Sequence, residues 1–484
     1  MQESAPHIAI IPTPGIGHLI PLTELARRLS NEFNFTITIL IPNDGFPPSK
    51  SQLSILQTLP NTISHLFLSP VDLTDLHSDA RIKTRIKLTL TRSLPAIRDS
   101  LRVLSESTRL VAVVVDLFGS DICDLAREIG ILPYIFFLTS ALGLCFGFSM
   151  QNLHNMHTCE FRDISDPVQF CPGSVPVHGA DFPDAAQCRK NESYKFLLDM
   201  KERYSKAVGI LVNSFFKLEP ATFKYLMEDC HQDHDKIPPV YPIGPIIRTD
   251  LEGDLNGLNY LKWLDEQPSK SVLFVSFGSG GNLSHEQVIE LALGLESSGQ
   301  RFLWVVKTPH DKANASYFSI NDFDDPLVYL PQGFLCRTKG LGLVVPSWAP
   351  QIQILSHGST GGFVTHCGWN SILESIVHGV PLIAWPLYAE QKLNSVLLAE
   401  DLKVALRVKP HEKGLIQRDQ IAQYAQCLIQ GEQGKLLRDN MRALNHEANI
   451  ALNEDGSSKE SLGKVVQAMM NHKIIGNGQM GVLN

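Results

Sequence analysis

The chain alternates short apolar runs with amphipathic stretches, and this alternation constrains its fold more than any other feature. In the first half, runs rich in β-branched and aromatic residues predict strands at 7–11, 35–41, 110–115, 134–137 and 209–213. Turn residues follow each run, and in most cases an amphipathic stretch such as Leu22–Leu29 comes next. The alternation predicts parallel strands joined by helices, in an α/β sheet that is buried on both faces.

A second series of the same kind begins after Lys270 and includes a predicted helix at 286–297. Its predicted strands are 271–277, 302–306, 343–345, 362–365 and 381–385. Between the two series lie the proline-rich stretch Ile237–Pro245 and a stretch containing Gly and Asp up to Gly257. Because proline at this density resists a helix or a central strand, we place the linker there.

A length of 484 residues supports two domains. We expect a first domain over 1–244, a linker over 245–257, a second domain over 258–460, and over 461–484 a helix that packs back on the first domain and frays at its end. The predicted fold is α/β, with two Rossmann-like domains facing each other across a cleft. Ligands of such folds bind at the carboxyl ends of the strands, so we expect the site in that cleft.

Composition argues against several functional classes. A net charge of −8 leaves no basic surplus for nucleic acid. The nine cysteines are scattered and form no CxxC pair, which favours a reducing compartment over a disulfide scaffold. The first residues lack the basic and apolar regions of a secretory signal. We therefore expect a cytoplasmic protein that acts as a monomer.

One uncharged segment, Ile129–Met150, is long enough to cross a bilayer. It contains Pro133 and several glycines, and it begins with a strand-like run. We therefore predict a buried strand that turns into a buried helix, without membrane insertion.

The most specific motif lies in the second half. Trp348-Ala-Pro-Gln351 opens a stretch that runs through His366-Cys-Gly-Trp-Asn-Ser371 and Glu374 to Tyr388-Ala-Glu-Gln391. Shorter motifs accompany it: Pro14-Gly-Ile-Gly-His18, Asp116-Leu-Phe-Gly119 and Phe277-Gly-Ser-Gly-Gly281. Together they resemble, over the whole chain, the plant secondary-product UDP-glycosyltransferases of glycosyltransferase family 1. Within that family the likeness is closest to the branch that glucosylates hydroquinone, monolignols and similar phenols. The resemblance implies the GT-B arrangement, with a UDP-sugar and a small aromatic acceptor as partners.

The residue types in this stretch match the parts of a UDP-sugar. Trp348 can offer an aromatic face to uracil, and Glu374 a carboxylate to the ribose diol. Residues 368–371 stand where a strand gives way to a predicted helix, whose first N–H groups suit phosphates. His366 and Ser279 can add donors. Each residue alone is more often structural, and it is their combination that predicts a UDP-sugar site.

Glu390 and Gln391 offer a carboxylate and an amide to the sugar hydroxyls. In the family, glutamine at the last position accompanies UDP-glucose, so we expect glucose as the donor sugar. The family's usual aspartate is Glu390 here, which leaves its hydrogen bonds to the sugar less defined. The resemblance assigns the donor site to Thr139, Ser279, Trp348, Ala349, Gln351, His366, Gly368, Trp369, Asn370, Ser371, Glu374, Tyr388, Glu390 and Gln391.

The first half supplies the reactive groups. His18 follows a glycine turn after the first strand, and Asp116 ends an apolar run, where a buried carboxylate needs a partner. By resemblance His18 is the general base and Asp116 orients it. An imidazole suits this role, because it can take a proton from an acceptor hydroxyl near neutral pH. Attack opposite the UDP leaving group inverts the anomeric carbon.

The first domain is also expected to build the acceptor pocket. Its candidate lining residues are Gly17, Phe118, Phe146 and Phe148. A small phenol is the acceptor that the resemblance implies. Attack through oxygen, nitrogen or carbon remains open at this point, and so does the choice of phenol.

Four alternatives compete with this interpretation. The Asp-x-Asp sequences at 233–235 and 322–324 match a short metal-binding pattern, and the cluster 230–235 could suggest zinc. Both lie in polar stretches and not at strand ends, so we expect neither a metal nor another cofactor. A UDP-sugar epimerase and a non-catalytic UDP-sugar-binding protein would share the architecture.

Overall fold

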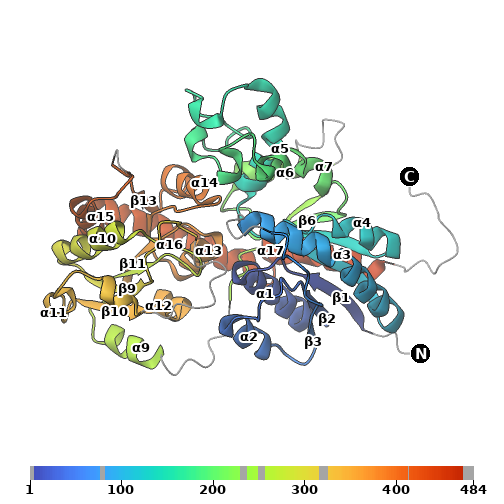
Figure 1. Cartoon of the computed structure of the whole chain (residues 1–484), viewed down its shortest axis with the longest axis horizontal. Helices are drawn as coiled ribbons and strands as arrows, with labels where there is room; N and C mark the ends of the chain where they lie inside the picture. Colours follow the sequence, from blue (N-terminus) through green and yellow to red (C-terminus); the bar gives the residue numbers. More distant parts are fainter. Residues whose placement is uncertain are drawn as a thin grey trace.

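The protein contains two parallel β-sheets, each flanked by helices (Figure 1). The computed structural model describes residues 5–76, 82–228, 237–248, 257–314, 325–411 and 414–472. The first sheet has the order β3-β2-β1-β4-β5-β6-β7. Its strands are β1 (Pro6–Ile11), β2 (Thr36–Ile41), β3 (Ile63–Phe67), β4 (Arg109–Asp116), β5 (Leu132–Phe137), β6 (Gly209–Val212) and β7 (Val240–Pro242). Its helices are α1 (Ile16–Phe33), α2 (Lys50–Gln57), α3 (Ile82–Ser107), α4 (Ile122–Ile129), α5 (Ala141–Met156), α6 (Glu192–Leu198), α7 (Met200–Tyr204) and α8 (Pro220–Met227).

The second sheet has the order β10-β9-β8-β11-β12-β13. Its strands are β8 (Val272–Ser276), β9 (Arg301–Val306), β10 (Gly342–Pro346), β11 (Thr360–Thr365), β12 (Leu382–Ala384) and β13 (Ala405–Arg407). The helices of the second half are α9 (Gly257–Asp265), α10 (His285–Ser298), α11 (Phe334–Arg337), α12 (Gln351–Ser356), α13 (Trp369–His378), α14 (Gln391–Val396), α15 (Arg418–Gln430), α16 (Glu432–Leu452) and α17 (Ser457–Asn471). The prediction of an α/β fold with two Rossmann-like units is confirmed.

All predicted strands correspond to strands of the structure, but three strands were missed. β7 lies inside the proline-rich stretch that we assigned to the linker. It pairs only with β6 at the sheet edge, where proline is tolerated because no further ladder needs its N–H. β3 has an exposed middle, and β13 has three residues, so neither shows a clear apolar run.

The uncharged segment 129–150 is a buried strand followed by a buried helix, as predicted. β5 lies inside the first sheet, and α5 begins after Ser140, whose side chain accepts from Gly143 N–H. Within the residues that the structure describes, no helix is long and apolar enough to cross a membrane.

The last helix, α17, returns to the first sheet. Leu462, Val465 and Met469 are buried in the same core cluster as β1, β2 and β4. Ser458 Oγ donates to Gly244 O at 2.6 Å, and α17 begins a few residues before the expected position of 461. The predicted frayed end lies outside the described residues, apart from its start.

Candidate active site

A cavity of about 1710 Å³ lies between the carboxyl ends of the two sheets, and both halves line it. Every residue that the sequence predicted for the donor lines this cavity, as do His18, Gly17, Phe118 and Phe146. These groups come from segments hundreds of residues apart. They meet because parallel strands place all their carboxyl ends at one edge of each sheet.

His18 and Asp116 lie together at this cavity. β1 and β4 are neighbours in the sheet, and α1 begins directly after Gly15, so the first turn of α1 faces the end of β4. His18 Nδ1 lies 2.9 Å from Asp116 Oδ2, and the carboxylate is fully buried. Donation from Nδ1–H to the carboxylate leaves Nε2 as the basic nitrogen.

The carboxylate of Asp116 is held by three further donors. Thr13 N–H donates to Oδ2 at 2.6 Å, Phe118 N–H donates to Oδ1 at 3.1 Å, and the Thr13 hydroxyl also donates to Oδ1. These bonds satisfy a buried charge and orient it toward the imidazole. Sequence reasoning missed Thr13, although a hydroxyl residue just after the first strand was a usable signal.

His366 lies across the cavity in a narrow slot between two glycines. A Cβ at Gly278 or at Gly368 would lie 2.4 Å from the imidazole, and Gly278 has a φ of 71°. Burial lowers the pKa of His366 to about 3, and the nearby Lys307 acts in the same direction. The ring is therefore neutral at physiological pH. Its Nδ1 is buried and has no hydrogen-bond partner among the described residues.

The N-terminus of α13 opens beside His366. Gly368 caps this helix and has no side chain to accept from its first N–H groups, which makes the end suitable for a phosphate. The next two residues also join the halves. Trp369 Nε1 donates to Asn213 O at 2.7 Å, and Asn370 Nδ2 donates to Gly17 O at 3.0 Å. These two side chains thus bridge the two units as well as lining the cavity.

At another part of the wall, the Trp348 side chain is 50% exposed and can present its face to a flat ring. Gln351 Nε2 donates to Glu374 Oε2 at 2.6 Å and to Ser371 Oγ at 2.9 Å. Burial raises the pKa of Glu374 to about 7, opposed by the Gln351 hydrogen bond and by Arg248. Arg248 also lines the cavity and was not predicted, because it follows the proline-rich stretch without a motif.

The loop before α14 carries Glu390 and Gln391. Gln391 Oε1 accepts from the N–H groups of Leu387 and Tyr388, both at 2.9 Å. The side-chain oxygen is therefore committed to the backbone, and the amide NH₂ is the group left to donate to a ligand. Burial raises the pKa of Tyr388 to about 12, so its phenol stays neutral.

The part of the cavity wall beside His18 carries aromatic rings. The His18 and Phe118 ring centroids lie 5.8 Å apart, and Phe118 lies 5.6 Å from Phe196, an unpredicted lining residue. Phe148 does not line the cavity, because it is buried with its ring edge-on to Tyr204 at 6.2 Å. Thr139 Oγ1 is buried and has no hydrogen-bond partner among the described residues.

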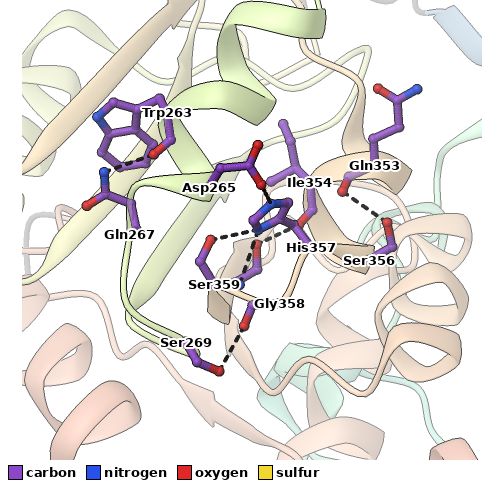
Figure 2. Close-up of polar contacts among 11 residues, drawn as sticks. Trp263, Asp265, Gln267, Ser269, Gln353, Ile354, Ser356, His357, Gly358 and Ser359 are labelled. Atoms are coloured by element: carbon purple, nitrogen blue, oxygen red, sulfur yellow. Dashed lines mark hydrogen bonds and ion pairs between the residues drawn. The ribbon is translucent and has the colours of Figure 1, made fainter.

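A polar cluster outside the cavity joins α9 and α12 to β11 (Figure 2). His357 Nε2 lies 3.0 Å from Asp265 Oδ1, and its Nδ1 lies 2.9 Å from Ser359 Oγ. Ser359 N–H also donates to Nδ1, and Ser359 is buried, so its hydroxyl is inaccessible as a nucleophile. The cluster is a structural connection.

The residues proposed for the metal-binding alternatives, 230–235 and 322–324, lie outside the described residues. Among the residues that are described, no three His, Cys, Asp or Glu side chains are grouped so that they could hold a metal ion.

Two facing Rossmann-like units with one cavity between the carboxyl ends of their sheets form the GT-B architecture of glycosyltransferases. Residues 255–410 match the family model described as UDP-glucoronosyl and UDP-glucosyl transferase. The chain belongs to the UDP-glycosyltransferase family, which confirms the resemblance inferred from its motifs.

Its relatives are similar over nearly their whole length. The chain is 57% identical to a hydroquinone glucosyltransferase of Rauvolfia serpentina, covering 96% of this chain and 98% of that protein. It is 51% identical to UDP-glycosyltransferase 72B1 of Arabidopsis thaliana, covering 98% of each. Among solved structures, Phytolacca americana UGT2 complexed with UDP-2-fluoro-glucose and pterostilbene is 47% identical with a TM-score of 0.87, covering 96% of this chain and 100% of that chain.

Proposed function

We propose that the protein transfers glucose from UDP-glucose to a hydroxyl of a small phenol, with inversion at the anomeric carbon. His18 Nε2 takes the proton of the acceptor hydroxyl as the oxygen attacks C1 and the bond to UDP breaks. Asp116 holds the imidazole and stabilises its charged form. The observation that carries the proposal is the 2.9 Å contact between His18 and Asp116 at a cavity that is also lined by the residues predicted for the donor.

The donor assignment rests on the second half. We assign uracil to Trp348, the ribose to Glu374, and the diphosphate to His366 and the N-terminus of α13. A neutral His366 can donate one N–H to a phosphate oxygen without a charge of its own. Glu390 and the Gln391 amide then face the hexose. The names of similar proteins, a hydroquinone glucosyltransferase among them, support glucose and a phenolic acceptor.

The acceptor assignment rests on the apolar wall beside His18. Such a wall suits a neutral ring, which gains from leaving water and stacks on aromatic edges. We propose that the reaction takes place in the cytoplasm, without a metal, on a monomeric enzyme.

The test is a mass-spectrometric screen of UDP-glucose with phenols, anilines and carbon-nucleophile acceptors. We expect phenolic O-glucosides from the wild type, and His18→Ala turnover lower by about 10²–10⁴-fold. Full activity in excess EDTA is expected. N- or C-glucosides as the main products would replace the proposal with its nitrogen or carbon alternative. Conversion of UDP-glucose without an acceptor would indicate an epimerase.

A further inference from the structure

A short segment of the first half reaches across to the donor loop of the second half. This segment, residues 179–187, contains the 3₁₀ turns Gly179–Asp181 and Asp184–Ala186, and we call it the strap. Figure 1 shows α14 beside the green segment that precedes α6. At one end of the strap, Asp181 forms an ion pair with Arg407 at the end of β13, with side chains only 18% and 22% exposed.

At the other end of the strap, Asp184 and Ala389 form a reciprocal pair of hydrogen bonds. Asp184 N–H donates to Ala389 O at 2.9 Å. Ala389 N–H donates to Asp184 Oδ2 at 2.7 Å. Both polar groups of the Ala389 backbone are therefore bound by a single residue of the opposite half.

The strap is firmly held on its own side. Phe182 is fully buried, and its ring packs on Phe146, Phe161 and Phe170 with centroids 5.2, 5.3 and 5.3 Å away. Gln187 Nε2 donates to two strap carbonyl oxygens, each at 2.9 Å. Because these contacts belong to the core of the first half, the strap can fix whatever it binds in the second.

What it binds is a strained residue. Ala389 has a φ of 59°, in the left-handed region that a residue with a Cβ avoids. Such conformations persist where neighbouring contacts over-determine them. Ala389 directly precedes Glu390 and Gln391, so its backbone angles decide where those two side chains point.

We propose that Asp184 is a positioning residue for the donor sugar. From the acceptor half it holds Ala389 in its strained conformation and thereby aims Glu390 and Gln391 at the hexose. The inference rests on the proposed function, because it takes the hexose to lie against these two side chains. The nucleotide is bound elsewhere, around Trp348 and Glu374, so loss of the contact should weaken binding of the sugar and not of UDP.

The test compares calorimetric affinities for UDP-glucose and for UDP. We expect Asp184→Ala to weaken UDP-glucose binding about tenfold while UDP affinity changes less than about twofold. Asp184→Asn should recover most of the loss, because its amide oxygen can still accept from Ala389 N–H. Asp163→Ala is the matched control: Asp163 is exposed on the same connecting segment, and its side chain makes no cross-cleft hydrogen bond within the described residues.

Equal weakening of UDP and UDP-glucose in Asp184→Ala would overturn the inference, and so would unchanged binding of both. Should Asp184→Ala fail to fold, Arg407→Gln loosens the other end of the strap and must shift the same affinity ratio. A wild type that binds UDP-glucose but glucosylates no phenol contradicts the proposed function and leaves this binding comparison intact.

Discussion

Replacing Asp116 by asparagine tests the His–Asp pair most directly. The carboxylate accepts from Thr13 N–H and His18 at Oδ2, and from the Thr13 hydroxyl and Phe118 N–H at Oδ1. An asparagine has one accepting oxygen, so one backbone N–H must lose its acceptor. The Thr13 bond is 2.6 Å and the Phe118 bond 3.1 Å, so we expect the amide oxygen to keep Thr13 and His18.

In that orientation His18 keeps its tautomer but loses the negative charge that stabilises the imidazolium. We therefore expect kcat to fall by about 10²–10³-fold, less than the loss of about 10⁴-fold known when the tautomer itself is reversed. The unsatisfied Phe118 N–H should destabilise the fold by about 1–3 kcal/mol. UDP affinity should change less than about twofold, because none of the residues that we assign to UDP forms a hydrogen bond with Asp116.

The assay combines steady-state kinetics with UDP-glucose and hydroquinone, calorimetry with UDP, and thermal unfolding. Thr13→Val is the matched control: it removes the hydroxyl donor but keeps the charge, so its kcat should fall far less. A kcat within about threefold of wild type in Asp116→Asn would refute the reasoning. A collapse of UDP affinity would show that Asp116 acts on the donor or on the fold.

Three further predictions concern the donor and acceptor walls. Gly278→Ala should weaken UDP binding at least about tenfold by calorimetry, because its Cβ would lie 2.4 Å from His366 at a residue with left-handed backbone angles. Unchanged affinity would contradict the inference that His366 must keep its position between the two glycines to bind UDP. Because burial raises the pKa of Glu374 to about 7, the carboxylate is increasingly protonated below that pH. UDP affinity should therefore fall as pH drops from 8 to 6, and Glu374→Gln, with no titrating group, should bind weakly and without this slope. Phe118→Ala should raise the acceptor KM with little change in Tm, whereas Phe148→Ala should lower Tm with little change in the acceptor KM. The reverse pattern would show that Phe148, and not Phe118, contacts the acceptor.

Part of this site could be predicted from the sequence because it is local. Strand β4 is an apolar run between Arg109 and Asp116, and strand β11 is buried along its whole length. The polar residues that follow such a parallel strand reach the carboxyl edge of the sheet wherever the chain goes next. The donor stretch from Trp348 to Gln391 lies in one continuous segment, so its spacing survives in the sequence.

Other features depend on contacts between residues that are far apart in the sequence, and no motif spacing indicates such contacts. Thr13 meets Asp116 across 103 positions, and Asp184 meets Ala389 across 205. The left-handed angle at Ala389 and the commitment of the Gln391 oxygen to the backbone arise only when those neighbours are in place. Phe148 and Phe118 were both predicted to line the acceptor pocket, and only packing sends one to the core and the other to the cavity.

The sequence by itself therefore determined the two parallel sheets, the family and the cavity residues within the stretch from Trp348 to Gln391, because these follow from periodicity and from motifs within single segments. Tertiary structure alone decided which further groups hold Asp116, which side chains connect the two halves, and how the donor loop is aimed. Those contacts join residues distant in the chain, and their geometry exists only once both sheets have formed and face each other.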